Sequence, residues 1–255
     1  MLPCEQISVA IRHAQAKGSP AIIAFLTGGF PVRSNFHELL CKVAEVADVV
    51  EIGVPFTDPM ADGLTIQRSS RAALEQGVSL KWILSMLSSA ATQPKAPLLL
   101  MSYLNPLLAF GFDKLPRAAR EAGVSGFIVP DLPYEESAEI RAALATQGLA
   151  LIQMVTPVTP QERLAMLCKS AEGFVYAVTM TGTTGKNVAV PQEVLSYMQR
   201  VKEVSTVPVC AGFGIRNREQ VQLMRDHVDG VVVGSALVEV LERGEDPAAF
   251  LKALR

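Results

Sequence analysis

Three carboxylates that could do acid–base chemistry lie in one short stretch of the sequence, Glu51, Asp58 and Asp62. Glu51 lies inside a β-branched, apolar run that ends at Gly53, and this run predicts a buried strand. The prolines that follow exclude a continuing strand or helix, so both aspartates are expected on a loop. A glutamic acid in an apolar site can donate and accept a proton, while a carboxylate on a polar loop can stabilise a positive charge. The alternative is that an arginine elsewhere in the chain neutralises a half-buried Glu51.

Glycine-containing turns follow the last three predicted strands, at Met180–Asn187, Gly212–Ile215 and Gly234–Ala236. Backbone N–H groups in such turns, together with the partial positive charge of a helix N-terminus, can bind phosphate. One such turn alone would indicate only a tight bend, but three in succession predict a phosphate site. ATP and NAD are not implied, because Asn187 replaces the Ser or Thr of a P-loop and Asn217 replaces the third glycine of the dinucleotide fingerprint.

The elements that must position these residues alternate regularly between strand and helix. An amphipathic helix is predicted first, at Cys4–Lys17. The predicted strands are nearly continuous apolar runs, at Ala21–Thr27, Asp48–Gly53, Pro97–Ser102, Gly126–Pro130, Leu149–Val155, Gly173–Thr179, Val207–Gly212 and Asp229–Gly234. The helical patterns that follow them lie near Asn35–Ala47, Thr65–Gln76, Leu80–Ala91, Asp113–Ala122, Glu135–Gln147, Pro160–Ser170, Pro191–Val204, Asn217–Asp226, Ser235–Glu242 and Pro247–Leu254.

This alternation is typical of a parallel sheet that helices cover. We therefore predict an α/β fold, a single (β/α)8 TIM barrel formed by residues 1–255, with an extra N-terminal helix. An open, doubly wound sheet is the alternative. In a barrel the carboxyl ends of the strands carry the active site, and both Glu51 and the glycine turns lie at such ends.

The composition excludes several other classes of protein. The chain has 255 residues, of which 49% are hydrophobic and 19% charged, which is enough for a large core. A net charge of −2 argues against nucleic-acid or anionic-membrane binding through bulk charge. No apolar run has the length of a membrane span and no signal-peptide pattern is present, so we expect a cytoplasmic protein. The four cysteines and three histidines are dispersed, so neither a metal site nor a catalytic triad is predicted.

The stretch from Glu51 to Gly63, EIGVPFTDPMADG, resembles the signature of tryptophan synthase alpha chains. The resemblance covers nearly the whole chain, continuing through Met101–Pro106, Gly126–Pro133, Gly182–Gly185 and Gly212–Gly214. It implies a lyase of tryptophan biosynthesis that cleaves indole-3-glycerol phosphate to indole and glyceraldehyde 3-phosphate by a retro-aldol reaction. It also implies a tryptophan synthase beta chain as partner, in an assembly of two alpha and two beta chains. No cofactor is expected in this chain, and pyridoxal phosphate is expected in the beta partner.

The resemblance also implies roles for individual residues. Glu51 matches the general acid/base that protonates the indole carbon bearing the side chain, Asp62 the carboxylate that binds the indole N–H, and Tyr176 the tyrosine beside the glutamate. The positions that match the phosphate site are Gly185, Gly214, Gly234 and Ser235. The expected walls of the indole pocket, for which plain barrel core is the alternative, are Phe25, Leu100, Tyr103, Ile128 and Leu132.

Three positions depart from the family pattern, of which Thr57 in place of serine is a mild change. Leu64 replaces a proline after the Asp-Gly pair, and Met180 stands where many members have a polar or basic residue. The segment Thr181–Val190 is expected to be a mobile lid that couples catalysis to a partner.

Two other functions remain open: a catalytically weak regulatory subunit that switches a beta chain, or another phosphate-binding barrel such as a sugar-phosphate isomerase. The second shares the glycine turns but not the Glu51–Gly63 signature.

Overall fold

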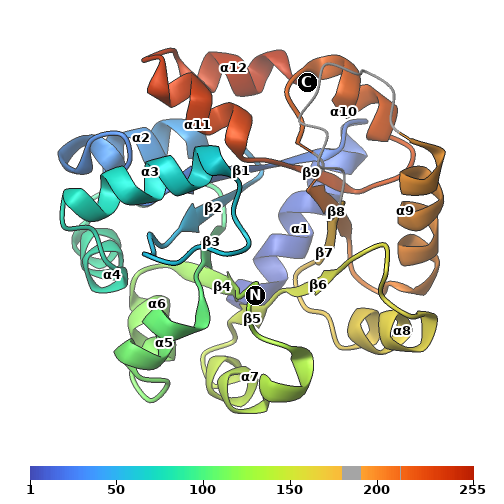
Figure 1. The fold of residues 1–255 in the computed structure, drawn as a ribbon, viewed down its shortest axis with the longest axis horizontal. Coiled ribbons are helices and arrows are strands. Elements are labelled where there is room, and N and C mark those ends of the chain that lie inside the picture. The colour runs from blue at the N-terminus through green and yellow to red at the C-terminus, as the bar shows by residue number, and fades with distance from the viewer. Residues whose placement is uncertain (180–190, 213) are drawn as a thin grey trace.

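The computed structural model describes residues 1–179, 191–212 and 214–255. Its strands form one parallel sheet, with the order β5-β4-β3-β2-β1-β9-β8-β7-β6, and helices surround this sheet (Figure 1). The strands are β1 (Ala21–Thr27), β2 (Val49–Gly53), β3 (Leu98–Met101), β4 (Val124–Ile128), β5 (Ala150–Leu151), β6 (Gln153–Val155), β7 (Val175–Val178), β8 (Val209–Gly212) and β9 (Gly230–Val233). The prediction of a parallel α/β barrel is therefore confirmed.

The fifth predicted strand, Leu149–Val155, is two strands in the structure, so the sheet has nine strands instead of eight. The run changes neighbours at Ile152. Up to that residue it pairs with β4, and the N–H of Ile152 donates to the carbonyl of Phe127 at 2.9 Å. From Gln153 onward it pairs with β7, in register with Val175. The two edges of the sheet thus meet within one short run, which nearly closes the barrel.

The helices are α1 (Pro3–Ala16), α2 (Phe36–Ala44), α3 (Leu64–Glu75), α4 (Leu80–Ser89), α5 (Leu104–Phe110), α6 (Leu115–Glu121), α7 (Ala138–Ala145), α8 (Gln161–Lys169), α9 (Gln192–Val204), α10 (Arg218–Met224), α11 (Ser235–Glu242) and α12 (Pro247–Ala253). Two short 3₁₀ turns, Arg33–Asn35 and Tyr134–Glu136, precede α2 and α7. None of the described helices is both long and apolar enough to cross a membrane.

Helix α5 was absent from the prediction, which placed only the helix at Asp113–Ala122 after the third strand. Pro106 is the third residue of α5, where its missing N–H would have no partner within the helix anyway. The N–H of Leu104 at the helix start instead donates to Asp131 Oδ1 at 2.9 Å.

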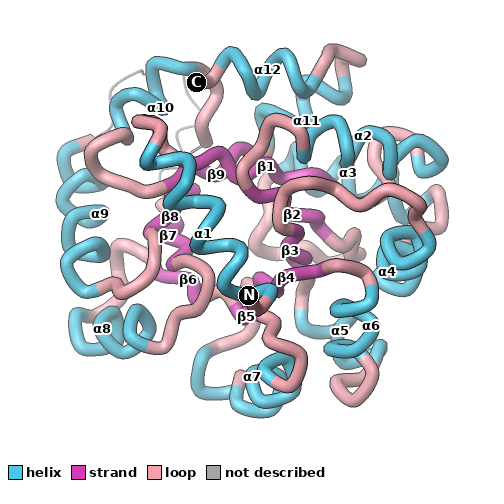
Figure 2. Tube along the Cα trace, turned by 180° about the vertical axis from the view of Figure 1, so that it is seen from behind, coloured by secondary structure: helices cyan, strands magenta, loops and turns pink. Residues whose placement is uncertain are grey.

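The hydrophobic core has two layers, one between the strands and the helices and one inside the barrel, and the carboxyl end of the barrel stays free for a site. Large apolar side chains fill the space between the strands and the surrounding helices, among them Leu26, Phe36 and Leu100. Helix α1 runs across the back of the strands and packs Ile7 and Ile11 into the barrel interior (Figure 2). The extra N-terminal helix thus closes the amino-terminal end of the barrel interior, which leaves the carboxyl ends of the strands for a site within the barrel.

Candidate active site

Glu51 is a buried carboxyl group inside the barrel. It lies on β2, in register with Phe25 on β1 and Leu99 on β3, and only 1% of it is exposed. Its Oε2 atom has no hydrogen-bond partner, and no lysine, arginine or histidine pairs with it, among the residues that the structure describes. These residues thus supply no cation of the kind that a structural ion pair would require.

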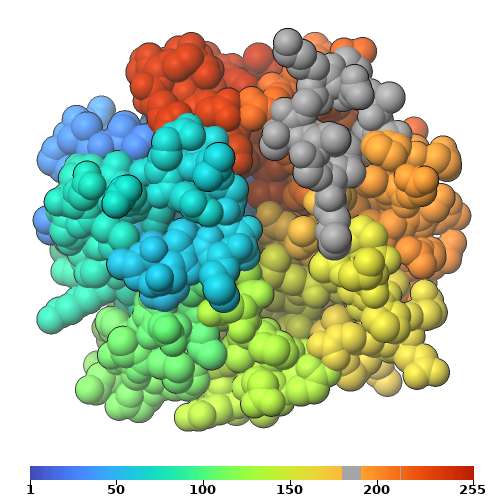
Figure 3. Space-filling model, viewed as in Figure 1, coloured from blue at the N-terminus to red at the C-terminus, as the bar shows by residue number. Residues whose placement is uncertain are grey.

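Glu51 lines a cavity of about 400 Å³ that opens at the carboxyl ends of the strands. The space-filling view shows the surface hollowed near the centre of this face (Figure 3). Burial, and next the nearby charge of Asp62, raise the pKa of Glu51 to about 8 from its ordinary value of 4.5. Because the charged form is disfavoured, Glu51 holds a proton at neutral pH and can deliver it to a bound molecule.

Asp62 lines the same cavity from the loop between β2 and α3. Tyr103 holds this loop, because its hydroxyl donates to Asp62 Oδ2 at 3.0 Å and accepts from the N–H of Ala61 at 2.9 Å. The Tyr103 ring stacks on Phe56, with 5.2 Å between the ring centres. Burial raises the pKa of Asp62, and the hydrogen bond from Tyr103 opposes that shift.

Asp58, the third carboxylate of the stretch, does not join the other two. It is exposed, and its Oδ2 atom accepts a hydrogen bond from the neighbouring Thr57. It is not among the residues that line the cavity. The pair that could act together is therefore Glu51 and Asp62.

Tyr176 on β7 also lines the cavity, and its neighbourhood gives a second reason for a glycine that the sequence analysis had placed where a strand ends and a turn begins. A Cβ at Gly212, on the adjacent strand β8, would lie 2.8 Å from the Tyr176 ring. Likewise, a Cβ at Gly53 would lie 2.5 Å from the ring of Phe25. Glycines at these two strand ends therefore make room for two aromatic rings. Burial, and then the charge of Glu51, raise the pKa of Tyr176 well above its ordinary value, so the hydroxyl stays protonated.

Three of the four residues expected at the phosphate site line the same cavity: Gly214, Gly234 and Ser235. Gly214 has φ of +68°, a left-handed conformation that favours glycine. Ser235 is the first residue of α11, so the unpaired N–H groups at the start of that helix lie beside the cavity. The fourth residue, Gly185, lies outside the described residues, as do Met180 and the expected lid.

Only some of the residues expected to form the walls of an indole pocket lie beside the cavity. Phe25 lines the cavity, and Tyr103 reaches it through Asp62. Leu100 is fully buried between the sheet and the helices, and Ile128 is fully buried in the barrel interior, so neither lines the cavity. Leu132 lines a different hollow, of about 410 Å³, between the loops that follow β4 and β6.

Several cavity residues were missed by the sequence analysis. The apolar ones lie at or near the carboxyl end of a strand: Met101, Met154, Val178 and Val232. Their position at the ends of the predicted strands was the signal that could have identified them. Arg216, on the turn between β8 and α10, is a charged residue of the lining that was also missed. Among the described residues, no cluster of histidine, cysteine, aspartate and glutamate could hold a metal ion.

Comparison with known proteins decides the family. The sequence model of the family described as "Tryptophan synthase alpha chain" matches residues 11–254. The chain belongs to this family. A tryptophan synthase alpha chain of Nitratidesulfovibrio vulgaris is 44% identical over 244 residues, 95% of each chain. One of Bacillus mycoides is 46% identical over 226 residues, 88% of each chain.

Solved structures of the family have the same fold. The crystal structure of tryptophan synthase subunit alpha from Legionella pneumophila superimposes with a TM-score of 0.87 at 30% identity, covering 98% of this chain and 96% of that one. A chain of the tryptophan synthase from M. tuberculosis in its aminoacrylate-bound form gives a TM-score of 0.87 at 33% identity, covering 98% and 97%. The resemblance of the Glu51–Gly63 stretch is thus part of a similarity that extends along the chain.

Proposed function

We propose that the cavity between Glu51 and Ser235 binds indole-3-glycerol phosphate and cleaves it to indole and glyceraldehyde 3-phosphate. Membership of the family makes the chain a lyase of tryptophan biosynthesis. The observation that carries the assignment of the site is Glu51, a carboxyl group that is buried and has no described partner in a cavity of about 400 Å³. Such a group is unfavourable for stability, and its presence is accounted for by the chemistry.

The reaction needs a proton delivered to an aromatic carbon and a second proton removed from a hydroxyl. Neutral Glu51 donates its proton to the indole carbon that bears the side chain, which makes the ring nitrogen positive. The resulting Glu51 carboxylate then takes the proton of the hydroxyl on the adjoining side-chain carbon. The carbon–carbon bond breaks, its electron pair returns to the ring, and an aldehyde forms. Glu51 ends protonated and the atoms balance.

Asp62 stabilises the positive charge that develops on the ring. Its carboxylate accepts a hydrogen bond from the indole N–H, and the interaction is strongest when that nitrogen is positive. Tyr103 fixes the orientation of Asp62 through the bond of 3.0 Å. The apolar side chains at the strand ends, together with Phe25 and Tyr176, form the surroundings of the indole ring.

The phosphate binds at the wall of the cavity formed after β8 and β9, through backbone N–H groups at Gly214, Gly234 and Ser235. The start of α11 adds a partial positive charge there. Gly185 completes this set by resemblance. Three or four such hydrogen bonds, each worth about 1.5–3 kcal/mol with a charged acceptor, anchor the substrate so that its indole end lies near Glu51.

The partner that we propose is a tryptophan synthase beta chain, in an assembly of two alpha and two beta chains. In this proposal pyridoxal phosphate is bound by the beta chain. The alpha chain works in the cytoplasm as a single domain. Met60, on the loop that carries Asp62, and Leu64, the first residue of α3, are 86% and 75% exposed. Apolar side chains this exposed suit a surface that a partner covers, and Leu64 stands where the family usually has proline.

The deciding experiment measures lyase turnover on indole-3-glycerol phosphate with and without a beta chain. We expect indole and glyceraldehyde 3-phosphate in equal amounts in both conditions, faster with the partner. If no indole forms in either condition, the alternative remains, a regulatory subunit that only switches the beta chain. A stimulated beta-chain reaction without cleavage would then identify that role.

A further inference from the structure

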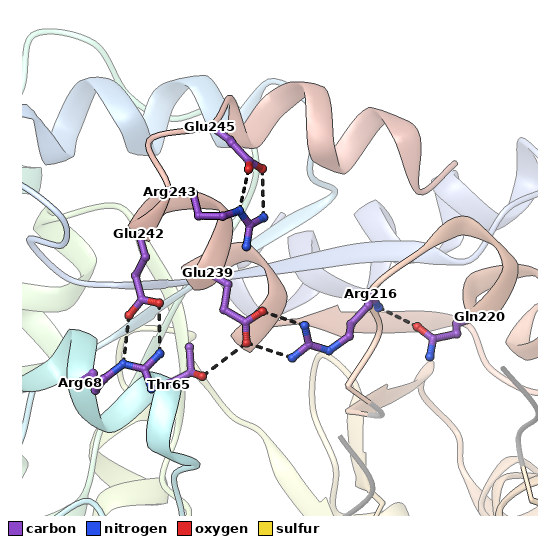
Figure 4. A network of polar contacts seen from close by, with 8 residues as sticks. All are labelled: Thr65, Arg68, Arg216, Gln220, Glu239, Glu242, Arg243 and Glu245. Atoms are coloured by element: carbon purple, nitrogen blue, oxygen red, sulfur yellow. Dashed lines mark hydrogen bonds and ion pairs between the residues drawn. The ribbon is translucent and has the colours of Figure 1, made fainter. Parts of the chain in front are cut away.

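Arg216 lies on the turn between β8 and α10 and lines the cavity together with Gly214, Gly234 and Ser235. Its guanidinium group makes a two-pronged contact with Glu239, with Nη1 2.7 Å from Oε2 and Nη2 2.9 Å from Oε1 (Figure 4). The N–H of Arg216 donates to Gln220 Oε1 at 2.7 Å, which holds the turn from its other side. The only positive side chain among the described residues of the cavity lining is thus committed to a carboxylate.

Glu239 joins two parts of the site. It lies on α11, one turn after Ser235, where the phosphate is proposed to bind. Its Oε1 atom also accepts a longer hydrogen bond, 3.4 Å, from Thr65 in the first turn of α3, and α3 begins two residues after Asp62 (Figure 4). The contact from Arg216 lowers the pKa of Glu239, so the carboxylate is charged at neutral pH.

A charged carboxylate one turn from a phosphate site is a physical difficulty. The start of α11 attracts an anion, but an unpaired Glu239 would repel the doubly charged phosphate from a short distance. Side chains of Arg216 and Glu239 are 40% and 25% exposed, so water screens the repulsion only in part. The pairing with Arg216 removes this repulsion and ties the turn that carries Gly214 to the helix that begins at Ser235.

We propose that Arg216 is a positioning residue for the phosphate of the substrate, acting by neutralising Glu239 and holding the two phosphate-binding turns together. The proposal rests on the phosphate site described under the proposed function. The alternative is that this pair, like many surface ion pairs, has little effect on phosphate binding. The chain provides a matched control, because Arg163 and Glu135 form a similar two-pronged pair whose side chains are 39% and 53% exposed, and neither residue lines the cavity.

The test measures binding of inorganic phosphate by calorimetry, together with KM and kcat for indole-3-glycerol phosphate. In Arg216→Gln we expect the Kd for phosphate and the KM to rise about tenfold, because Glu239 is left unpaired, while kcat changes less than about twofold. Glu239→Gln should instead bind phosphate more tightly than the natural chain, since it frees a guanidinium beside the site. The double variant should recover most of the affinity lost in Arg216→Gln. Arg216→Lys should bind better than Arg216→Gln, and Arg163→Gln should match the natural chain.

The opposite signs of the two single variants separate this role from a loss of folding, which would weaken binding in both. Melting temperatures of all variants provide the control. Equal phosphate affinity in Arg216→Gln and Arg163→Gln would overturn the proposal, and so would a double variant no better than Arg216→Gln. If the natural chain itself binds no phosphate at millimolar concentrations, the phosphate site fails first. If it binds phosphate and Arg216→Gln binds it equally well, only the role of Arg216 fails.

Discussion

Replacing Glu51 with glutamine removes the proton donor and keeps the size of the side chain. The variant cannot deliver or accept a proton at the indole carbon, so we expect lyase turnover to fall by about 10²–10⁴-fold. In the natural chain, kcat/KM should fall as the pH rises through about 8, because burial raises the pKa of Glu51 to about 8 and the proton is lost above it. The assay is the rate of indole formation from pH 6 to 9.

The same substitution predicts a change in the pH dependence of stability. Between pH 4.5 and about 8 the folded chain keeps a proton on Glu51 that the unfolded chain releases, so the free energy of unfolding falls as the pH rises through this window. At roughly 1.36 kcal/mol for each pH unit, the interval from 4.5 to about 8 amounts to about 5 kcal/mol above pH 8. Glutamine stays neutral, so Glu51→Gln should escape this loss and become the more stable protein at alkaline pH.

Urea unfolding followed by circular dichroism at pH 5, 7 and 9 measures this difference. The difference in free energy of unfolding between Glu51→Gln and the natural chain, the stability gap, should grow in favour of the variant with each increase in pH. As a control, Glu121→Gln removes an exposed carboxylate whose partner is Arg117, and its gap should stay nearly constant. A gap for Glu51→Gln that does not grow with pH would refute the buried, protonated carboxyl. Turnover within a few-fold of the natural chain would refute its catalytic role.

The remaining predictions concern the other walls of the site. Asp62→Asn should lower kcat about 100-fold with an unchanged melting temperature, because an amide stabilises the cation poorly; near-normal turnover in steady-state assays would show that Asp62 only structures its loop. Tyr103→Phe leaves Asp62 and the N–H of Ala61 without their bonds of 3.0 and 2.9 Å, and kcat/KM should fall tenfold or more, at about 1–3 kcal/mol for the unpaired groups; an unchanged kcat/KM would exclude the positioning role. Gly234→Asp should mainly raise KM through its charge, whereas Gly234→Ala should be mild, because a Cβ there lies 3.7 Å from the nearest atom; equal KM values would argue against phosphate at this turn.

Much of the architecture could be predicted from the order of residues alone. Short apolar runs that alternate with amphipathic segments specify a parallel sheet under helices, since the pattern reflects burial on both faces of each strand. The glutamate within the second of these runs stood out because a charged residue is rare there. Proline and glycine placed Asp62 on a loop and Gly214 in a left-handed turn.

The walls of the cavity could not be predicted in the same way. Both faces of a barrel strand are apolar, so the sequence pattern does not tell the inside from the outside. Leu100 and Met101 are neighbours on β3, yet Leu100 packs against the helices and Met101 lines the cavity. Ile128 lies inside the barrel but does not reach the cavity, because depth along the barrel axis depends on how the strands tilt and close.

The sequence by itself determined most of the elements, the family resemblance and the residue types available for chemistry, because local pattern and composition depend on neighbours along the chain. The tertiary structure alone decided which of these residues meet. Thr65 and Glu239 are 174 positions apart in the chain and share a hydrogen bond. The pKa of Glu51 depends in the same way on burial within the barrel and on the nearby charge of Asp62. Such contacts and electrostatic effects arise only when the barrel closes, since they act through space and not along the chain.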